Sequence, residues 1–157
     1  MAEEHVFETT VEYPADPAQK VPPDPAFSRD NRMRGSGAHP ELPGALPPAL
    51  GGHDRGYSPE DLLILSLSEC HLLTYLYLAQ RKGIAIRRYQ DRATGRLGKN
   101  AAGQTQMLEV VLRPRVTVPR GTDPAAVNAL HERAHHYCFI ANSVNFPVRH
   151  EPEAVEE

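Results

Sequence analysis

Two cysteines are the residues of this chain most able to do chemistry. Cys70 lies within a strongly apolar segment, and Cys138 lies much later, at the end of a second segment with helical patterning. A thiolate attacks electrophiles such as peroxides, and the resulting sulfenic acid can condense with a second thiol to a disulfide. The two cysteines are therefore either a redox pair or two small residues of the core, where free cysteines are common.

A nucleophilic cysteine needs a positive charge nearby to favour its thiolate. The helix dipole acts only within the first turn, and Cys70 lies in the middle of the predicted helix, so the charge must come from elsewhere in the chain. Arg29, Arg32 and Arg34 precede a long loop and are candidates for this role. Each of them, taken alone, also fits an ordinary solvated surface.

The direct neighbours of Cys70 have opposite effects on a thiolate. The Glu69 carboxylate disfavours it unless the side chain points away, whereas a protonated His71 favours it. The sequence therefore leaves open how strongly the thiol is activated.

His131, Glu132 and His135 match the H-E-x-x-H pattern of zinc metalloproteases, which places two imidazoles one helical turn apart. A catalytic zinc also needs a third protein ligand and an open position for water. The later carboxylates lie in what we predict to be a loose tail, and Arg133 would bring a positive charge next to the metal. We therefore rank a zinc peptidase below thiol chemistry and expect a helix surface with His135 or His136 packed near Cys138.

The composition is that of a globular protein, and we assign one domain to residues 1–157. The formal net charge is -3 and the isoelectric point is about 6.2, so the basic face of a nucleic-acid-binding protein is not expected, nor is a membrane partner. The sequence after Met1 has no basic segment followed by an apolar one, so no signal peptide is predicted. We expect a cytoplasmic protein, in a compartment where structural disulfides are rare.

The best-marked element is the helix that contains Cys70. Ser58 suits its N-cap, Pro59 its first helical position and Gly83 its end. Apolar residues lie on all sides of the segment 62–78 and are interrupted by polar ones. This pattern predicts a core helix that is buried all round rather than a membrane span.

The remaining segments predict strands and a second helix. Strands are expected over residues 5–13, 27–34, 84–97, 105–118 and 144–148, with a hairpin at 98–103. A second helix follows Asp123-Pro124. The stretch 35–57 predicts a long irregular loop, and 151–157 a loose tail. The fold class is α+β, with antiparallel sheets packed around the buried central helix and a second helix.

Two motifs resemble those of the OsmC/Ohr thiol peroxidases, the osmotically inducible and organic hydroperoxide resistance proteins. Ser-Pro-Glu-Asp-Leu-Leu at 58–63 and Ser-Leu-Ser-Glu-Cys-His at 66–71 are similar to the central helix of that family. Ala-His-His-Tyr-Cys-Phe-Ile-Ala-Asn-Ser at 134–143 resembles its second-cysteine motif. Phe-Ser-Arg-Asp at 27–30 is similar to its amino-terminal Arg-Asp element. The order of elements agrees over nearly the whole chain.

The resemblance implies an OsmC-like fold, an intertwined homodimer and the reduction of organic (alkyl or lipid) hydroperoxides. It implies that Cys70 is the peroxidatic thiolate, that Cys138 is the resolving thiol, and that Glu60 pairs with Arg29 and orients it on the thiolate. An external dithiol of the lipoyl or thioredoxin kind would reduce the disulfide, with no cofactor and no metal.

The spacing of Glu60 and Cys70 adds a geometric constraint. They are ten residues apart on one predicted helix, which separates them by about 15 Å along its axis. The two cannot share a site within one straight helix, but across a two-fold axis the helix start of one subunit can approach the helix middle of the other. This favours a dimer with composite active sites.

Two further hypotheses remain open at this point. A redox-sensing or stress-response binding protein on the same fold would keep both cysteines without fast turnover. The apolar residues of the loop 35–57 either line an approach for an alkyl or lipid hydroperoxide or cover the core; they are Leu42, Leu46, Pro47, Pro48 and Leu50.

Overall fold

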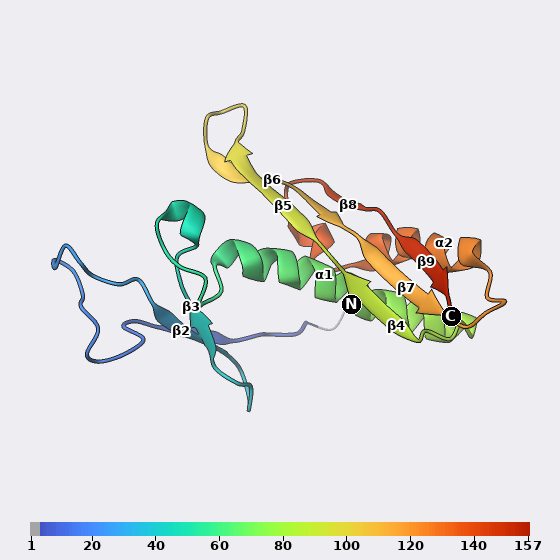
Figure 1. The fold of residues 1–157 in the computed structure, drawn as a ribbon, viewed down its shortest axis with the longest axis horizontal. Coiled ribbons are helices and arrows are strands. Elements are labelled where there is room, and N and C mark those ends of the chain that lie inside the picture. Colours follow the sequence, from blue (N-terminus) through green and yellow to red (C-terminus); the bar gives the residue numbers. More distant parts are fainter. Residues whose placement is uncertain (1–3) are drawn as a thin grey trace. The chain divides into compact units, whose positions relative to one another are not determined.

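The computed structural model describes residues 4–157 and divides into two compact units (Figure 1). Of the described residues, 4–62 belong to the first unit and 63–157 to the second.

The first unit is built on a small antiparallel sheet with the strand order β1-β2-β3. Its strands are β1 (Thr9–Glu12), β2 (Asn31–Gly35) and β3 (Leu42–Gly44). Met33 pairs with Val11 on one side and with Leu42 on the other. The predicted loop at 35–57 is therefore not irregular throughout, because it contributes β3 and a short 3-10 helix, Pro48–Leu50. The connection between β1 and β2 has no strand or helix, as predicted for its five prolines.

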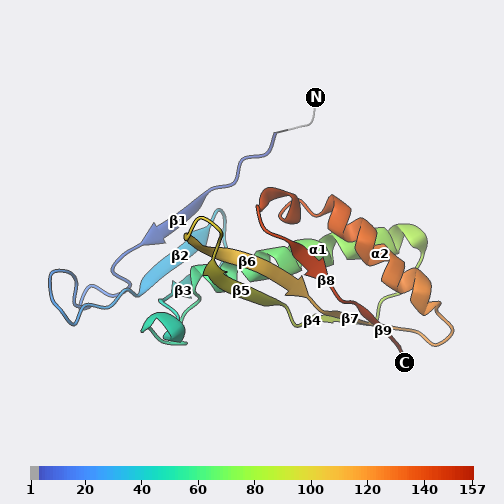
Figure 2. The same cartoon turned by 90° about the horizontal axis from the view of Figure 1, so that it is seen from above.

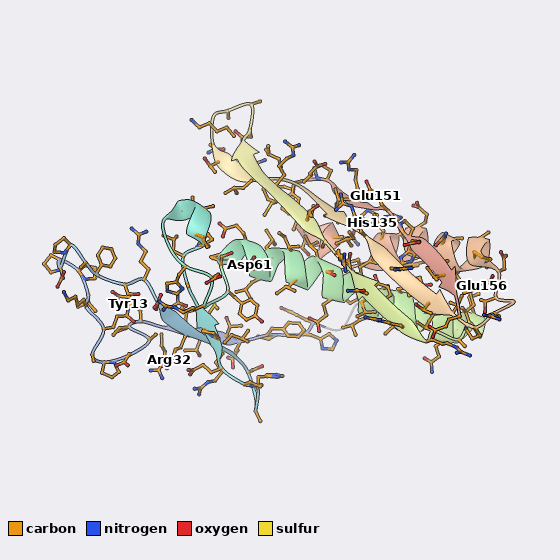
Figure 3. The ribbon with its side chains drawn as sticks, in the orientation of Figure 1. Tyr13, Arg32, Asp61, His135, Glu151 and Glu156 are labelled. Atoms are coloured by element: carbon orange, nitrogen blue, oxygen red, sulfur yellow. The ribbon has the colours of Figure 1, made fainter. Side chains whose placement is uncertain are left out.

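The helix α1 (Pro59–Lys82) begins and ends where the sequence predicts. The Ser58 hydroxyl accepts the Asp61 N–H (3.1 Å), and the Asp61 carboxylate accepts the Ser58 N–H (3.0 Å), which satisfies two free amide groups of the first turn. Asp61 lies at the start of the helix in Figure 3. At the other end Gly83 adopts a left-handed conformation, with φ of 67°, and ends the helix.

The second unit contains two three-stranded sheets, with the strand orders β4-β7-β9 and β5-β6-β8. Their strands are β4 (Arg88–Asp91), β5 (Thr94–Lys99), β6 (Thr105–Leu112), β7 (Pro114–Val118), β8 (Val148–His150) and β9 (Glu153–Glu156). Each of the two long strands predicted for 84–97 and 105–118 is thus divided in two. The second division falls at Arg113. Its N–H donates to the Asp91 side-chain carboxylate (2.6 Å) and not to the backbone of a neighbouring strand.

Two expectations about these sheets are wrong. The sheets are not purely antiparallel, because β8 runs parallel to β6 and β9 runs parallel to β7. The tail at 151–157 is not loose, because four of its residues form β9. Its charged residues suit an edge strand, where alternate side chains face solvent.

The helix α2 (Pro124–Tyr137) packs with α1 on the sheets of the second unit (Figure 2). Asp123 caps it, as predicted, by accepting the Ala125 N–H (2.9 Å). The shared core contains Tyr75, Leu78 and Ala79 of α1, Val116 and Val118 of β7, and Val127, Leu130 and Ala134 of α2. Gly95 of β5 permits close contact with α1, since a Cβ there would lie 2.6 Å from Ile64 Cδ1.

The helix α1 is buried on one side only in the single chain, contrary to the expectation that it is buried all round. Leu65, Leu73, Leu76 and Tyr77 keep 38–59% of their surface exposed. By length and composition alone the helix could also cross a membrane. Its other face, however, packs into the core of the second unit and includes the fully buried side chains of Leu67, His71 and Tyr75.

A cluster of imidazoles joins α1 to α2 inside the second unit. His71 Nε2 and His131 Nδ1 share a hydrogen bond of 2.9 Å, and both side chains are fully buried. The Tyr75 ring stacks on His131 with a centroid distance of 4.2 Å. The centroid of the His150 ring lies 5.7 Å from that of His71 and 5.4 Å from that of His135. Burial, and after it the neighbouring imidazoles, lowers the pKa of His71 to about 4 and of His131 to about 3, so both are neutral at pH 7.

Acidification should destabilise the fold through these two histidines. An exposed imidazole has a pKa of about 6.5, well above the values of about 4 and about 3 in the fold. Below about pH 6.5 the unfolded chain therefore binds more protons than the folded chain. As a result, the free energy of unfolding decreases as the pH is lowered. From pH 7 to pH 5 we expect each histidine to remove about 2 kcal/mol. Urea unfolding followed by circular dichroism at one protein concentration measures this loss.

The matched variants are His131→Asn and His39→Asn. Asparagine at 131 keeps a polar group near the Nδ1 position and cannot titrate, so the loss between pH 7 and pH 5 should shrink by about 2 kcal/mol. His39 is exposed in the first unit, and its replacement should leave the pH dependence unchanged. The same pH dependence in the parent and in His131→Asn would contradict the role of the cluster.

Candidate functional site

The two thiols lie in contact within the second unit. Cys70 is on α1, and Cys138 is the residue directly after α2, where the backbone turns from helical to extended. The two side chains are close enough for Cys70 to influence the pKa of Cys138, and both thiols are free. Cys138 is buried, whereas Cys70 is partly exposed. Two cysteines far apart in sequence are thus neighbours in the fold.

The two thiols differ in their readiness to lose a proton. Burial, and after it the hydrogen bond to Cys70, raises the pKa of Cys138 to about 11. Cys138 therefore stays protonated at neutral pH and can donate its S–H to the Cys70 sulfur. The backbone N–H groups of Ile140 and Ala141 also point at the Cys138 sulfur. These two groups lower the pKa of Cys138, but less than burial and Cys70 raise it.

His71, the neighbour of Cys70 that could have favoured its thiolate, does not do so. His71 points into the core and is neutral at pH 7, because burial lowers its pKa to about 4. It therefore supplies no positive charge to the thiol. Glu69 is exposed on the outside of α1. A cation for the thiolate must come from another part of the protein.

Of the three arginines that the sequence nominates, Arg29 is the one without an ion pair among the described residues. It lies in the first unit, just before β2, and its guanidinium carbon is 5.3 Å from the centroid of the Phe27 ring. Arg34 instead pairs with Glu41 at 3.0 Å, and Arg32, labelled in Figure 3, pairs with Glu41 at 3.8 Å. Within residues 4–157, Arg29 forms no ion pair with a carboxylate.

Glu60 lies in the first turn of α1, and its carboxylate has an unused acceptor. The Oε2 atom is buried and has no hydrogen-bond partner in the described part of the chain. Glu60 and Arg29 belong to the same unit, yet no ion pair joins them among the described residues. The ion pair that the family resemblance implies is therefore not formed within this one chain.

The H-E-x-x-H segment contributes a buried histidine to the core of the second unit. His131 is fully buried against His71 and Tyr75, and Glu132 extends outward, where it accepts a hydrogen bond from His150 (3.2 Å). Figure 3 labels His135 on α2, and its carbonyl accepts the Cys138 N–H (3.3 Å). Across the described residues, no three His, Cys, Asp or Glu side chains are grouped so that they could hold a metal ion. The arrangement does not support a zinc peptidase.

Sequence reasoning missed the pairing of His71 with His131 and an apolar groove along α1. A signal for the groove was present, because Cys70, Thr74, Tyr77 and Arg81 recur at the spacing of one helix face. The contribution of the loop residues of 35–57 to a substrate approach stays a prediction.

Comparison with known proteins agrees with this arrangement. The family model described as OsmC-like protein matches residues 52–153, which include both cysteines and Glu60 but not Arg29. An OsmC-like protein of unknown function from Vibrio cholerae is 28% identical, with a TM-score of 0.83 over 95% of this chain and 99% of that chain. No curated protein matches the sequence.

Organic hydroperoxide resistance proteins share the fold at lower identity. The protein from Elizabethkingia anophelis is 18% identical, with a TM-score of 0.74 and complete coverage of both chains. OhrB of Bacillus subtilis is 16% identical, with a TM-score of 0.65 over 96% of this chain and 98% of that chain. The family model covers about two-thirds of the sequence and includes both cysteine segments, and the chain therefore belongs to the OsmC-like protein family.

Proposed function

We propose that this protein is a cysteine-based peroxidase that reduces organic hydroperoxides to alcohols. The observation that carries the proposal is the contact between the partly exposed Cys70 thiol and the buried, protonated Cys138 thiol. A free thiol pair of this kind has one sulfur for attack and one for resolution. The hydroperoxide resistance proteins of the same fold agree with this reaction class.

The reaction has three steps that balance in atoms and electrons. The Cys70 thiolate attacks the outer peroxide oxygen, an S–O bond forms, the O–O bond breaks, and the alkoxide takes up a proton and leaves as the alcohol. The sulfenic acid then condenses with the Cys138 thiol, which forms the disulfide and releases water. An external dithiol, of the lipoyl or thioredoxin kind, supplies two electrons and two protons by thiol–disulfide exchange.

The site is completed in a homodimer by Arg29 and Glu60. Three features support this: Arg29 pairs with no described carboxylate, Glu60 has a buried acceptor without a described partner, and α1 exposes apolar residues along one face. Exposed apolar surface of this kind is typical of a protein interface. In such a dimer Arg29, held by Glu60, stabilises the Cys70 thiolate and the departing alkoxide.

The same thiol pair would also serve a redox-sensing protein, and steady-state turnover separates the two functions. With a dithiol reductant, a peroxidase consumes many equivalents of cumene hydroperoxide per chain in fast steady-state turnover, whereas a sensor lacks fast turnover. The need for such a reductant agrees with the cytoplasmic location expected from the sequence.

Replacement of either cysteine should stop turnover at a different step. Cys70→Ser should lose peroxidase turnover entirely, because a serine hydroxyl stays protonated at neutral pH and cannot attack the peroxide. Cys138→Ser should complete one attack and then accumulate sulfenic or over-oxidised Cys70. Turnover and intact-protein mass spectrometry measure the two outcomes. Undiminished turnover in Cys70→Ser would refute the mechanism.

One equivalent of hydroperoxide without reductant should join Cys70 and Cys138 within one chain. The thiols are already in contact, so no partner chain is needed for this step. Peptide mapping under non-reducing conditions identifies the linkage. A bridge between two chains, or two free thiols, would show that Cys138 is not the resolving residue.

Loss of Arg29 should slow the attack by Cys70 more than loss of its neighbours. An arginine–thiolate contact of about 1.4 kcal/mol corresponds to a factor of ten, so Arg29→Ala should react about tenfold more slowly at pH 7. Arg32→Ala and Arg34→Ala should have smaller effects, since both residues pair with Glu41. Stopped-flow peroxide reduction and the pH dependence of Cys70 alkylation measure the difference.

Glu60→Ala should slow the reaction less than Arg29→Ala, because it frees the guanidinium without removing it. If Arg29→Ala behaves like the parent while a neighbour does not, another arginine serves the thiolate.

A further inference from the structure

His53 binds the carboxylate of the residue that follows Arg29 in the chain. Its Nε2 atom lies 2.8 Å from Asp30 Oδ1, and both side chains are partly buried. The other ring nitrogen, Nδ1, accepts the Arg55 N–H (3.2 Å) and therefore carries no proton. The ring proton thus lies on Nε2, from which it donates to the Asp30 carboxylate.

The loop that carries His53 is fixed by its own backbone. The His53 N–H donates to the Leu46 carbonyl (3.0 Å), and the Gly52 N–H donates to the Pro47 carbonyl (3.1 Å). Only glycine permits this close approach, since a Cβ at position 52 would lie 1.8 Å from the Leu46 carbonyl oxygen. The backbone of the loop therefore determines where the His53 ring lies.

The segment around Arg29 is also fixed at its backbone. The Ser28 carbonyl accepts hydrogen bonds from the Tyr13 hydroxyl, labelled in Figure 3 (2.9 Å), and from the Gln19 amide (3.1 Å). The same amide donates to the Asp30 carbonyl (3.1 Å), and the Asp30 N–H donates to the Ser28 hydroxyl (3.1 Å). These bonds hold the main chain on both sides of Arg29, so the pairing of its side chain is decided by the neighbouring side chains.

Arg29 and Asp30 line the same hollow of the first unit. Its volume is about 360 Å³, and Phe27 and His53 line it as well. Consecutive side chains of opposite charge that face one hollow are within reach of each other, and an arginine–carboxylate pair is a favourable contact. The hydrogen bond from His53 to Asp30 therefore competes with an ion pair between Arg29 and Asp30.

We propose that His53 is a positioning residue, which binds the Asp30 carboxylate and so keeps the Arg29 guanidinium unpaired for the thiolate. The inference rests on the proposed function, in which Arg29 stabilises the Cys70 thiolate, and identifies the residue that keeps this cation available. A guanidinium paired with Asp30 favours the thiolate less, because the carboxylate beside it repels the same negative charge.

A purely structural role is the alternative for a hydrogen bond between two partly exposed side chains. In that role, loss of His53 and loss of the Asp30 charge both weaken the same contact and act in the same direction. In the positioning role they act in opposite directions, because the first change frees a carboxylate and the second removes it. The test therefore combines the two changes.

The test measures the rate of Cys70 alkylation by iodoacetamide at pH 7, with peptide mass spectrometry to locate the label. His53→Ala should slow alkylation about threefold, the size of an exposed arginine–carboxylate pair, and should shift its pH dependence to higher pH. The double variant His53→Ala/Asp30→Asn should regain the rate of the parent. His53→Gln, whose amide can still donate to Asp30, should react like the parent, as should the matched control His39→Ala, an exposed histidine of the same unit.

A second comparison determines whether His53 acts through Arg29. In the Arg29→Ala background, His53→Ala should cause no further loss, since no guanidinium is left to pair with Asp30. An additional loss in this background would overturn the inference, because it would make His53 a structural residue. A His53→Ala variant that reacts like the parent, or a rate that Asp30→Asn does not restore, would overturn it as well.

Alkylation requires no hydroperoxide, so the result is separate from turnover. Absence of steady-state turnover in the parent would refute the peroxidase, while the alkylation rates would still decide on His53. Slower alkylation in Arg29→Ala without a change in His53→Ala would overturn this inference alone. Unchanged alkylation in both variants would overturn it together with the contact between Arg29 and the thiolate.

Discussion

The hydrogen bond between His71 and His131 is the contact that fixes the two cysteine-bearing segments relative to each other. His71 follows Cys70 directly, and His131 lies seven residues before Cys138 on α2, so a shift of one helix against the other would separate the sulfurs. Both imidazoles are fully buried, and the bond requires one nitrogen to accept, which a doubly protonated pair cannot provide. The geometry of the thiols therefore depends on a neutral polar contact in the core and not on apolar packing alone.

This arrangement divides the requirements of a thiol site between two parts of the chain. The second unit supplies the paired thiols, a protonated donor in Cys138 and the groove, but its histidines are neutral and add no charge to Cys70. In the proposed mechanism the missing charge comes from Arg29, held by Glu60, whose buried Oε2 has no hydrogen-bond partner among the described residues. The homodimer proposed above would account for three features of residues 4–157: Arg29 forms no ion pair, Glu60 Oε2 has no hydrogen bond, and one face of α1 exposes apolar residues.

The sequence predicts best what is determined locally. The limits of α1 follow from Ser58, Pro59 and Gly83, because a cap and a left-handed glycine act within a few residues. The parallel pairing of β8 with β6 and of β9 with β7 could not be predicted, since each strand depends on a partner about forty residues earlier in the chain. Likewise, the motifs indicate that Cys70 and Cys138 belong together, but only the three-dimensional structure identifies the protonated thiol and excludes His71 as a cation. The assignment of a single domain to residues 1–157 stays a prediction.

The short strand β9 determines which strand lies at the edge of its sheet. It covers one edge of β7, whose other edge is occupied by β4, and the Glu157 N–H donates to the Val118 carbonyl at the end of the pairing (2.9 Å). Without these last residues, β7 would present free backbone groups next to the apolar side chains of Val116 and Val118. An uncovered edge of this kind is a template for strands of other molecules. The last residues therefore keep the apolar strand β7 in the centre of its sheet and leave the charged strand β9 at the edge.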